Sequence, residues 1–204
     1  MEVLFICALP DESNGETTLF GSPIIHTGVG KINAGYKTAL AIQQYKPKFV
    51  CNFGSCGSFQ LEKGTLVTVK EVFNGDMDAE PFVRYSVTPF EEDGGSFPVM
   101  DMGVKCFTTE TFITRDKIKS FPPQKLELLN NCSIFEMELY SITRVCREFK
   151  IPITSYKWVS DDGGTEDWVE NCRIGYEQFK QKFYNTYIKA VSYTHLTLPT
   201  KRIV

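Results

Sequence analysis

A strand-helix-strand pattern with acidic strand ends occupies residues 133–164 and constrains the fold of this chain most strongly. Ser133-Ile134-Phe135-Glu136-Met137-Glu138-Leu139 places two carboxylates after an apolar run, and apolar residues at helical spacing continue to Phe149. A second apolar run, residues 153–159, leads into Ser160-Asp161-Asp162. Ligands bind at the carboxyl ends of strands in open α/β sheets, so the unit predicts a site at these acids. Two ordinary strand ends with solvated acids are the alternative interpretation.

Strands and helices alternate along the rest of the chain. Val3-Leu4-Phe5-Ile6-Cys7-Ala8 is a continuous apolar run, which is typical of a buried central strand. Apolar patterning predicts further strands over residues 24–27, 49–53, 65–73 and 104–113, a helix that ends at Pro47, and a terminal helix over residues 166–189. This alternation predicts an α/β protein.

The helical pattern breaks abruptly near the end of the chain. Residues 191–204 resemble translated sequencing-adaptor sequence rather than a continuation of the terminal helix. No internal repeat or interdomain linker divides the preceding residues. We therefore expect a single domain over residues 1–190 and a tail at 191–204 that is foreign to the fold.

Composition and charge argue against several classes of partner. The net charge is −3 without a basic stripe, which argues against binding to nucleic acid. No apolar run approaches the roughly 20 residues that span a bilayer, and Met1-Glu2 leads directly into a strand without the features of a signal peptide. The 7 cysteines lie mostly in apolar runs, which suits buried free thiols in a reducing compartment. We therefore expect a cytoplasmic protein without membrane partners.

Two glycine-containing segments offer backbone to a ligand. Gly28-Val29-Gly30-Lys31 precedes a helix whose free N–H groups suit an anion, but it completes neither a P-loop nor a dinucleotide fingerprint, and a tight strand-to-helix turn is the alternative. Gly54-Ser55-Cys56-Gly57-Ser58 is a second segment of small residues. With no CxxC and only His26 and His195, a zinc site is not expected, and strand-end acids on distant segments are weak evidence for Mg²⁺.

Five motifs, taken in order, resemble those of the nucleoside phosphorylase/nucleosidase superfamily. They are Pro10-Asp11-Glu12, TGVGKINA at 27–34, NFGSCG at 52–57, FEME at 135–138 and Val159-Ser160-Asp161. Over roughly residues 1–188, the chain looks most like a short form of the methylthioadenosine/S-adenosylhomocysteine nucleosidase branch. The resemblance implies a three-layer α-β-α fold with a mixed central sheet. It also implies a homodimer that hydrolyses the N-glycosidic bond of a purine nucleoside, without metal or organic cofactor.

The resemblance also implies a role for each matching residue. Asp161 would donate a proton to N7 of the purine, Ser160 would orient that carboxyl group, and Glu12 would activate the attacking water. Glu138 would hold the ribose hydroxyls, with Met137 packing under the sugar. The other substrate-binding positions would be Glu136, Phe135, Phe112, Ile113, Ser55 and Gly57. An acid at the base and carboxylates near the sugar suit a reaction that builds positive charge on ribose and negative charge on the base.

The identity of the nucleophile separates two branches of this superfamily. Its phosphorylases bind phosphate with arginines after the first strand and just before the Gly-Ser-Cys-Gly loop, where this chain has Pro10-Asp11-Glu12 and Asn52. An anion site without cations is poor, so water is the expected nucleophile. Gly-Ser-Cys-Gly is nevertheless phosphorylase-like, and Thr109-Glu110 replaces the usual Gly-Asp. A phosphorylase and a nucleoside-binding protein without turnover are therefore the alternatives.

Overall fold

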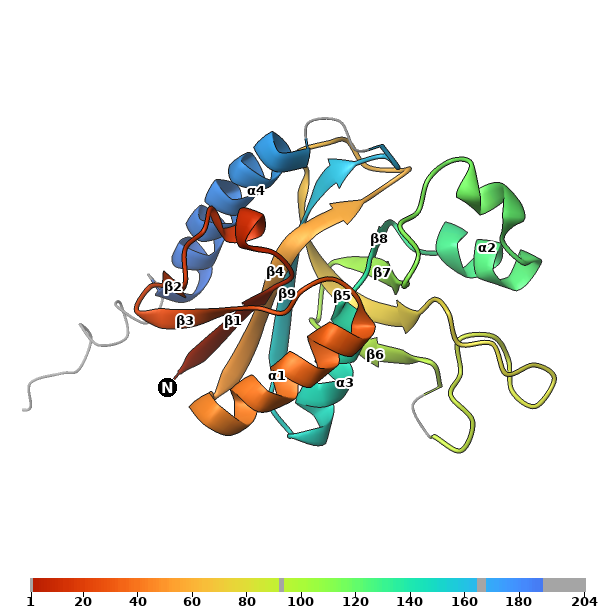
Figure 1. Cartoon of the computed structure of the whole chain (residues 1–204), viewed down its shortest axis with the longest axis horizontal. Helices are drawn as coiled ribbons and strands as arrows, with labels where there is room; N and C mark the ends of the chain where they lie inside the picture. The colour runs from red at the N-terminus through yellow and green to blue at the C-terminus, as the bar shows by residue number, and fades with distance from the viewer. Residues whose placement is uncertain (1, 92–93, 165–167, 189–204) are drawn as a thin grey trace, which may run out of the picture.

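A mixed β-sheet forms the centre of the protein, with helices on both of its faces (Figure 1). The computed structural model describes residues 2–91, 94–164 and 168–188. The strands are β1 (Val3–Cys7), β2 (Thr18–Leu19), β3 (Ser22–His26), β4 (Phe49–Gly57), β5 (Leu66–Asn74), β6 (Ser96–Pro98), β7 (Val104–Thr108), β8 (Ile134–Glu136) and β9 (Ile153–Asp161). The helices are α1 (Lys31–Tyr45), α2 (Pro123–Asn130), α3 (Leu139–Glu148) and α4 (Trp168–Phe183). Short 3-10 turns cover Pro10–Ser13 and Lys117–Ser120, and a π turn covers Tyr184–Ile188.

Five strands of the sheet close into a ring. β4 pairs with β9, β9 with β5, β5 with β7, β7 with β8, and β8 returns to β4. The pairs β4–β9, β5–β7 and β7–β8 are parallel, whereas β4–β8 and β5–β9 are antiparallel, so the sheet is mixed as expected. β1, β3 and β2 extend the sheet from the free side of β4, and β6 extends it from β5. Closure removes most of the open edges that a flat sheet would leave.

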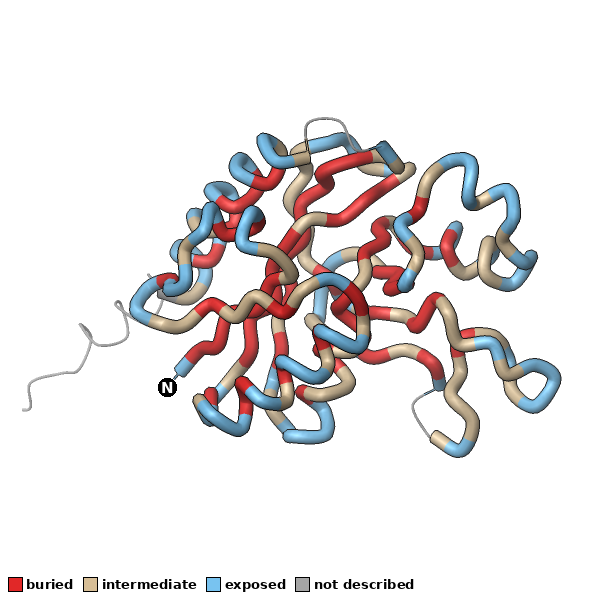
Figure 2. The backbone as a smooth tube through the Cα atoms, in the orientation of Figure 1, coloured by how far each residue is buried: buried red, intermediate tan, exposed pale blue. Residues whose placement is uncertain are grey.

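Two apolar cores lie between the sheet and its helical layers. One core packs α1 and α3 against the sheet through residues such as Ala41, Ile42 and Ile142. The other packs α4 against the opposite face, where the rings of Phe53 and Phe179 stack with centroids 4.6 Å apart. Figure 2 shows the buried strands lying between helices whose outer faces are exposed. The expected three layers of helix, sheet and helix are therefore confirmed.

Several element boundaries differ from those that the sequence predicts. The strand expected over residues 104–113 ends at Thr108, so residues 109–113 form a connecting segment. The helix α2 is an element that the apolar patterning does not predict. The two strands of the strand-helix-strand unit, β8 and β9, would be neighbours if they paired directly, but β4 lies between them in the sheet. The tail predicted at 191–204 lies outside the described residues.

The cysteines and the helices bear on the remaining expectations from composition. All of the cysteines are buried and free, as the sequence predicts. Within the described ranges, no helix is long and apolar enough to cross a membrane.

Candidate active site

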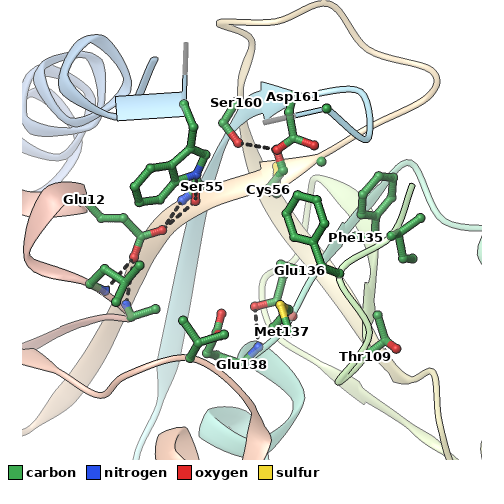
Figure 3. A pocket seen from close by; sticks show the side chains of 18 of the residues that line it. Glu12, Ser55, Cys56, Thr109, Phe135, Glu136, Met137, Glu138, Ser160 and Asp161 are labelled. Atoms are coloured by element: carbon green, nitrogen blue, oxygen red, sulfur yellow. Dashed lines mark hydrogen bonds between the residues drawn. The ribbon is translucent and has the colours of Figure 1, made fainter. Parts of the chain in front are cut away.

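A cavity of about 780 Å³ opens where several strands end (Figure 3). Its walls come from the loop after β1, the ends of β4 and β9, residues 109–113, β8 with the residues after it, and the start of α4. Every residue that the sequence analysis expects at the site lines this cavity: Glu12, Ser55, Gly57, Phe112, Ile113, Phe135, Glu136, Met137, Glu138, Ser160 and Asp161. The fold thus brings these side chains together, while the action of each on a substrate stays a prediction.

Gly57 is the position at which three strand ends meet. It is paired with Phe135 of β8 on one side and with Asp161 of β9 on the other. A Cβ atom at Gly57 would lie 2.1 Å from the Phe135 ring, far inside van der Waals contact. The absence of a side chain here therefore lets the Phe135 ring lie across the end of β4 and form part of the cavity wall.

Glu12 is fixed by four hydrogen bonds. It lies on the 3-10 turn after β1, where its Oε2 accepts from the backbone N–H groups of Ala8 and Leu9 at 2.8 and 3.1 Å. Its Oε1 accepts from the backbone N–H and the hydroxyl of Ser55, each at 2.7 Å. The side chain is buried, yet it lines the cavity. Its carboxylate therefore has a single orientation toward the end of β4.

Trp168 extends this hydrogen-bonded group. Its indole N–H donates to the Ser55 hydroxyl at 3.3 Å, and its side chain lines the cavity. In the sequence, Trp168 stands at helical spacing from other apolar residues of the terminal helix, so periodicity alone predicts a packing role for it. Nothing in the spacing of a helix reveals that its first turn faces a ligand cavity.

Asp161 ends β9 and is held by its neighbours in the chain. The Ser160 hydroxyl lies 2.8 Å from Asp161 Oδ2, and the Gly163 N–H donates to Oδ1 at 2.9 Å. Asp162, the next residue, is about half exposed and pairs with Arg115 and Lys63. The two adjacent acids therefore differ in environment, and only Asp161 lines the cavity.

A buried ion pair joins Glu136, on the cavity wall, to Lys157 of β9. Glu136 Oε2 accepts from Lys157 Nζ at 3.1 Å and from the backbone N–H groups of Glu138 and Leu139 at 3.0 and 2.8 Å. Burial lowers the pKa of Lys157, but the attraction of Glu136 and Glu138 outweighs it and raises that pKa above its ordinary value. Lys157 stands inside an apolar run, so the pattern alone predicts a buried strand and no charged group of the site. A lysine in a buried strand next to an acidic motif is the signal that could have revealed it.

Glu138 is held at the beginning of α1. Its Oε1 accepts from the Gly30 N–H at 2.8 Å, and the next N–H, that of Lys31, donates to Glu110 Oε1 at 2.7 Å. Burial and the nearby Glu136 raise the pKa of Glu138 to about 8. The N–H groups of this glycine-containing turn therefore bind carboxylates of the protein itself. These are the N–H groups that the sequence suggested as a site for an anion.

Aromatic and aliphatic side chains form the wall next to Asp161. Ile113 is buried, whereas Phe112 is 40% exposed at the cavity, on the segment that follows β7. Phe135 packs against Phe59 with ring centroids 5.0 Å apart. These residues suit a flat aromatic ligand, which offers two ring faces for stacking.

The fold and the acid-lined cavity define the class of protein, and comparison with known proteins identifies that class. The family model described as the Phosphorylase superfamily matches residues 18–189. This chain therefore belongs to the phosphorylase superfamily, as its sequence motifs predict.

Individual relatives narrow the comparison. The 5'-methylthioadenosine/S-adenosylhomocysteine nucleosidase of Bacillus cereus (strain G9842) is 28% identical over 180 residues, which cover 76% of this chain and 72% of that protein. The structure of such a nucleosidase from Colwellia psychrerythraea 34H, in complex with adenine, has a TM-score of 0.74 and 22% identity, and covers 87% of this chain and 90% of that one. A futalosine hydrolase mutant of Helicobacter pylori strain 26695 has a TM-score of 0.75 and 15% identity, covering 90% and 99%. At these identities the solved structures establish a shared fold.

Proposed function

We propose that this protein hydrolyses the N-glycosidic bond of a purine nucleoside, releasing free base and a ribose moiety. The single observation that carries the proposal is that Glu12 and Asp161 line one cavity from different strand ends. One carboxylate can then act on the sugar side while the other acts on the base. The curated relative named a 5'-methylthioadenosine/S-adenosylhomocysteine nucleosidase supports a nucleoside with a modified 5′ position.

The two carboxyl groups would move protons in opposite directions. Asp161, once protonated, would give its proton to N7 of the purine, so that the base leaves without a negative charge. Ser160, 2.8 Å from Asp161 Oδ2, would keep the carboxyl group directed at the base. Glu12 would accept a proton from the water that attacks the anomeric carbon of the ribose. Its hydrogen bonds to Ser55 hold it in place for this step.

The sugar would lie over the acidic motif. Glu138 would bind the ribose hydroxyls and Met137 would pack against the ring, since both line the cavity. Developing positive charge on the ribose would be stabilised by the acidic side chains that line the cavity. Phe112, Ile113 and Phe135 would contact the base from the apolar wall. Glu136, already bound to Lys157, would act chiefly by holding the backbone of this motif.

Charge favours water over phosphate as the nucleophile. The charged side chains among the described residues that line the cavity are all acidic: Glu12, Glu136, Glu138, Asp161 and Glu170. Lys157 is a buried cation next to the cavity-lining Glu136, and it is already paired with that residue. Phosphate would meet repulsion here without an arginine to offset it. This supports a hydrolase rather than a phosphorylase.

We further propose that the protein is a homodimer of the cytoplasm. Ile32, Tyr36 and Leu40 form an exposed apolar stripe along α1. Val29, exposed and on the cavity wall, continues that stripe to the mouth of the site. A second copy packed on the stripe would cover apolar surface and shield the 5′ end of the substrate.

Release of free base from a panel of purine nucleosides, followed by liquid chromatography with and without phosphate, tests the proposal. We expect release without phosphate, slowed roughly 10²- to 10⁴-fold by Asp161→Asn, which cannot transfer the proton. Asp162→Asn is the matched control, because Asp162 pairs with Arg115 instead, and it should keep the wild-type rate. Strictly phosphate-dependent release would establish a phosphorylase, and binding without release would establish a binding protein. Either result would reject the proposal.

A further inference from the structure

Asp76 is an acid at a strand end that does not line the cavity. It follows β5, and its carboxylate accepts four hydrogen bonds. Oδ1 accepts from Lys125 Nζ at 2.8 Å and Thr109 Oγ1 at 2.7 Å, while Oδ2 accepts from Lys31 Nζ at 2.8 Å and the Glu110 N–H at 2.7 Å. Burial raises the pKa of Asp76, but the hydrogen bonds from Lys125, Lys31 and Thr109 outweigh it and hold that pKa well below its usual range. Asp76 is therefore an ionised hub rather than a free metal ligand.

Asp76 contacts two parts of the site, and the first is the segment of residues 109–113. This segment begins with Thr109 and Glu110, and its Phe112 and Ile113 form part of the cavity wall. Asp76 binds the side chain of Thr109 and the backbone of Glu110. The Thr109 hydroxyl also accepts from the Thr111 N–H at 3.1 Å. The position of the apolar wall therefore depends on two residues that Asp76 holds directly.

The second part that Asp76 contacts is the beginning of α1. The Lys31 side chain donates to Asp76, while its backbone N–H donates to Glu110 Oε1 at 2.7 Å. The preceding N–H, that of Gly30, donates to Glu138 Oε1 at 2.8 Å. A Cβ atom at Gly30 would lie 2.7 Å from Glu110 Oε2, so the turn and this segment are in close contact. Asp76 thereby connects the apolar wall to the turn that holds Glu138.

We propose that Asp76 is a positioning residue for glycosidic cleavage. It fixes the position of residues 109–113 relative to Glu138. The inference rests on the proposed function, in which residues 109–113 contact the base and Glu138 binds the sugar. The scissile bond joins base to sugar, so the relative placement of the two walls decides whether both halves are bound at once. Misplacement of about 1 Å can lower a catalysed rate roughly 100-fold. Asp76 acts only through its neighbours, since it lines no part of the cavity.

Kinetics and base binding of Asp76→Asn separate positioning from a general loss of structure. We expect kcat/KM for 5′-methylthioadenosine to fall about 10-fold, while the Kd for adenine alone, measured by calorimetry, changes less than about 2-fold. Adenine needs only the apolar wall, whereas the nucleoside needs both walls aligned. Asp78→Asn, an exposed acid two residues away, is the matched control and should behave as wild type. Equal losses for adenine and the nucleoside, or wild-type kinetics, would overturn the proposal.

Hydrogen exchange tests the same connection without relying on turnover. Asp76→Ala should speed amide exchange both at Gly30-Lys31 and in residues 109–113, while the central strands keep wild-type protection. Faster exchange in only one of the two segments, or in neither, would refute the connection. If the wild-type protein released no base from any nucleoside, the proposed function would fail, and the exchange data would still decide whether Asp76 links the two walls.

Discussion

Four of the acidic side chains that line the cavity are buried, and their hydrogen-bond donors differ. Glu12 accepts from three backbone N–H groups and a hydroxyl. Glu136 is paired with Lys157, and Asp161 lies beside Ser160 and the Gly163 N–H. Glu138 has one N–H donor and lies near Glu136, so burial and that neighbour raise its pKa to about 8. The environment of each group, rather than its type, distinguishes the acids at this scale.

The raised pKa of Glu138 predicts a pH dependence of stability. In the folded protein the Glu138 carboxyl group keeps its proton up to about pH 8, whereas the ordinary pKa of a glutamate is 4.5. The contribution of Glu138 to the free energy of unfolding is thus complete below about pH 4.5 and is lost as the pH rises to about 8. Urea titrations measure how far the free energy of unfolding falls between these two pH values. In Glu138→Gln this fall should be smaller than in the wild type by more than about 1.4 kcal/mol, the equivalent of one pKa unit. The exposed Glu62→Gln should keep the wild-type slope; if Glu138→Gln kept it too, the assignment would be wrong.

Removing the Lys157 ammonium should strongly destabilise the fold. Lys157→Met leaves the Glu136 carboxylate buried without its cation, which costs about 3–5 kcal/mol in the free energy of unfolding. Lys105→Met, which breaks a partly exposed pair with Glu71, is the control and should cost about 0–1 kcal/mol. Chemical denaturation measures both values. Equal costs for the two variants would show that Lys157 and Glu136 contribute no more than a surface pair.

Among the elements, α4 lies close against the sheet because of a glycine. A Cβ atom at Gly175 would lie 2.2 Å from the ring of Trp158, which is fully buried on β9. The helix therefore approaches the sheet at a position without a side chain. The beginning of α4 carries Trp168 into the cavity, so this packing also contributes to the site.

Alanine at two helical glycines tests that packing. Gly175→Ala should destabilise the fold by about 1–3 kcal/mol, because the buried Trp158 ring has no room to move. Gly35→Ala in α1 is the matched control: its Cβ would lie 3.6 Å from Ser141, an ordinary contact, so it should stabilise by about 0.5–1 kcal/mol. Thermal unfolding reports both. A neutral Gly175→Ala would show that α4 does not depend on this close approach.

Local patterns predicted most elements and misjudged those that tertiary contacts shape. The apolar run at β1 and the helical spacing in α1 and α3 predicted the right element types. In α1, however, the apolar residues Ile32, Tyr36 and Leu40 are exposed, so the spacing identified the helix but not its buried face. Thr108 ends β7 five residues earlier than expected, since the chain turns to bring Thr109 and Glu110 onto Asp76. No property of residues 104–113 taken alone encodes that turn.

At the scale of the whole molecule, the sequence motifs predicted the residues that line the cavity but not the residues that hold them in position. Glu12 and Asp161 are far apart in sequence, but β1 and β9 both pair in parallel with β4, which places the residues at their carboxyl ends around one cavity. The resemblance to the superfamily supplied that pairing. The motifs did not predict the roles of Lys157 and Asp76. Lys157 contacts Glu136 and Asp76 contacts Lys31 of α1, and the spacing of residues along the chain does not reveal such long-range contacts.

The exposed stripe on α1 predicts the assembly of the molecule. Ile32→Glu places a charge at the most exposed side chain of that stripe and should shift a dimer toward monomer, since a buried unpaired charge is costly. Ile174→Glu, at a partly exposed position on α4, should leave the assembly unchanged. Sedimentation velocity distinguishes the two species. A wild-type protein that is monomeric at all concentrations, or an Ile32→Glu protein that stays dimeric, would contradict the assignment.

The source of the oxygen in the sugar product tests the central claim most directly. Wild-type protein is incubated with 5′-methylthioadenosine in phosphate-free buffer made with isotopically heavy-oxygen water, and the products are analysed by mass spectrometry. Attack by water assisted by Glu12 predicts free adenine and a methylthioribose that already carries one heavy oxygen at its anomeric carbon in the first turnovers, before the open-chain sugar exchanges oxygen with the solvent. Intact nucleoside at the end of the incubation, or a sugar product that forms only when phosphate is added and appears as a sugar 1-phosphate, would contradict the account.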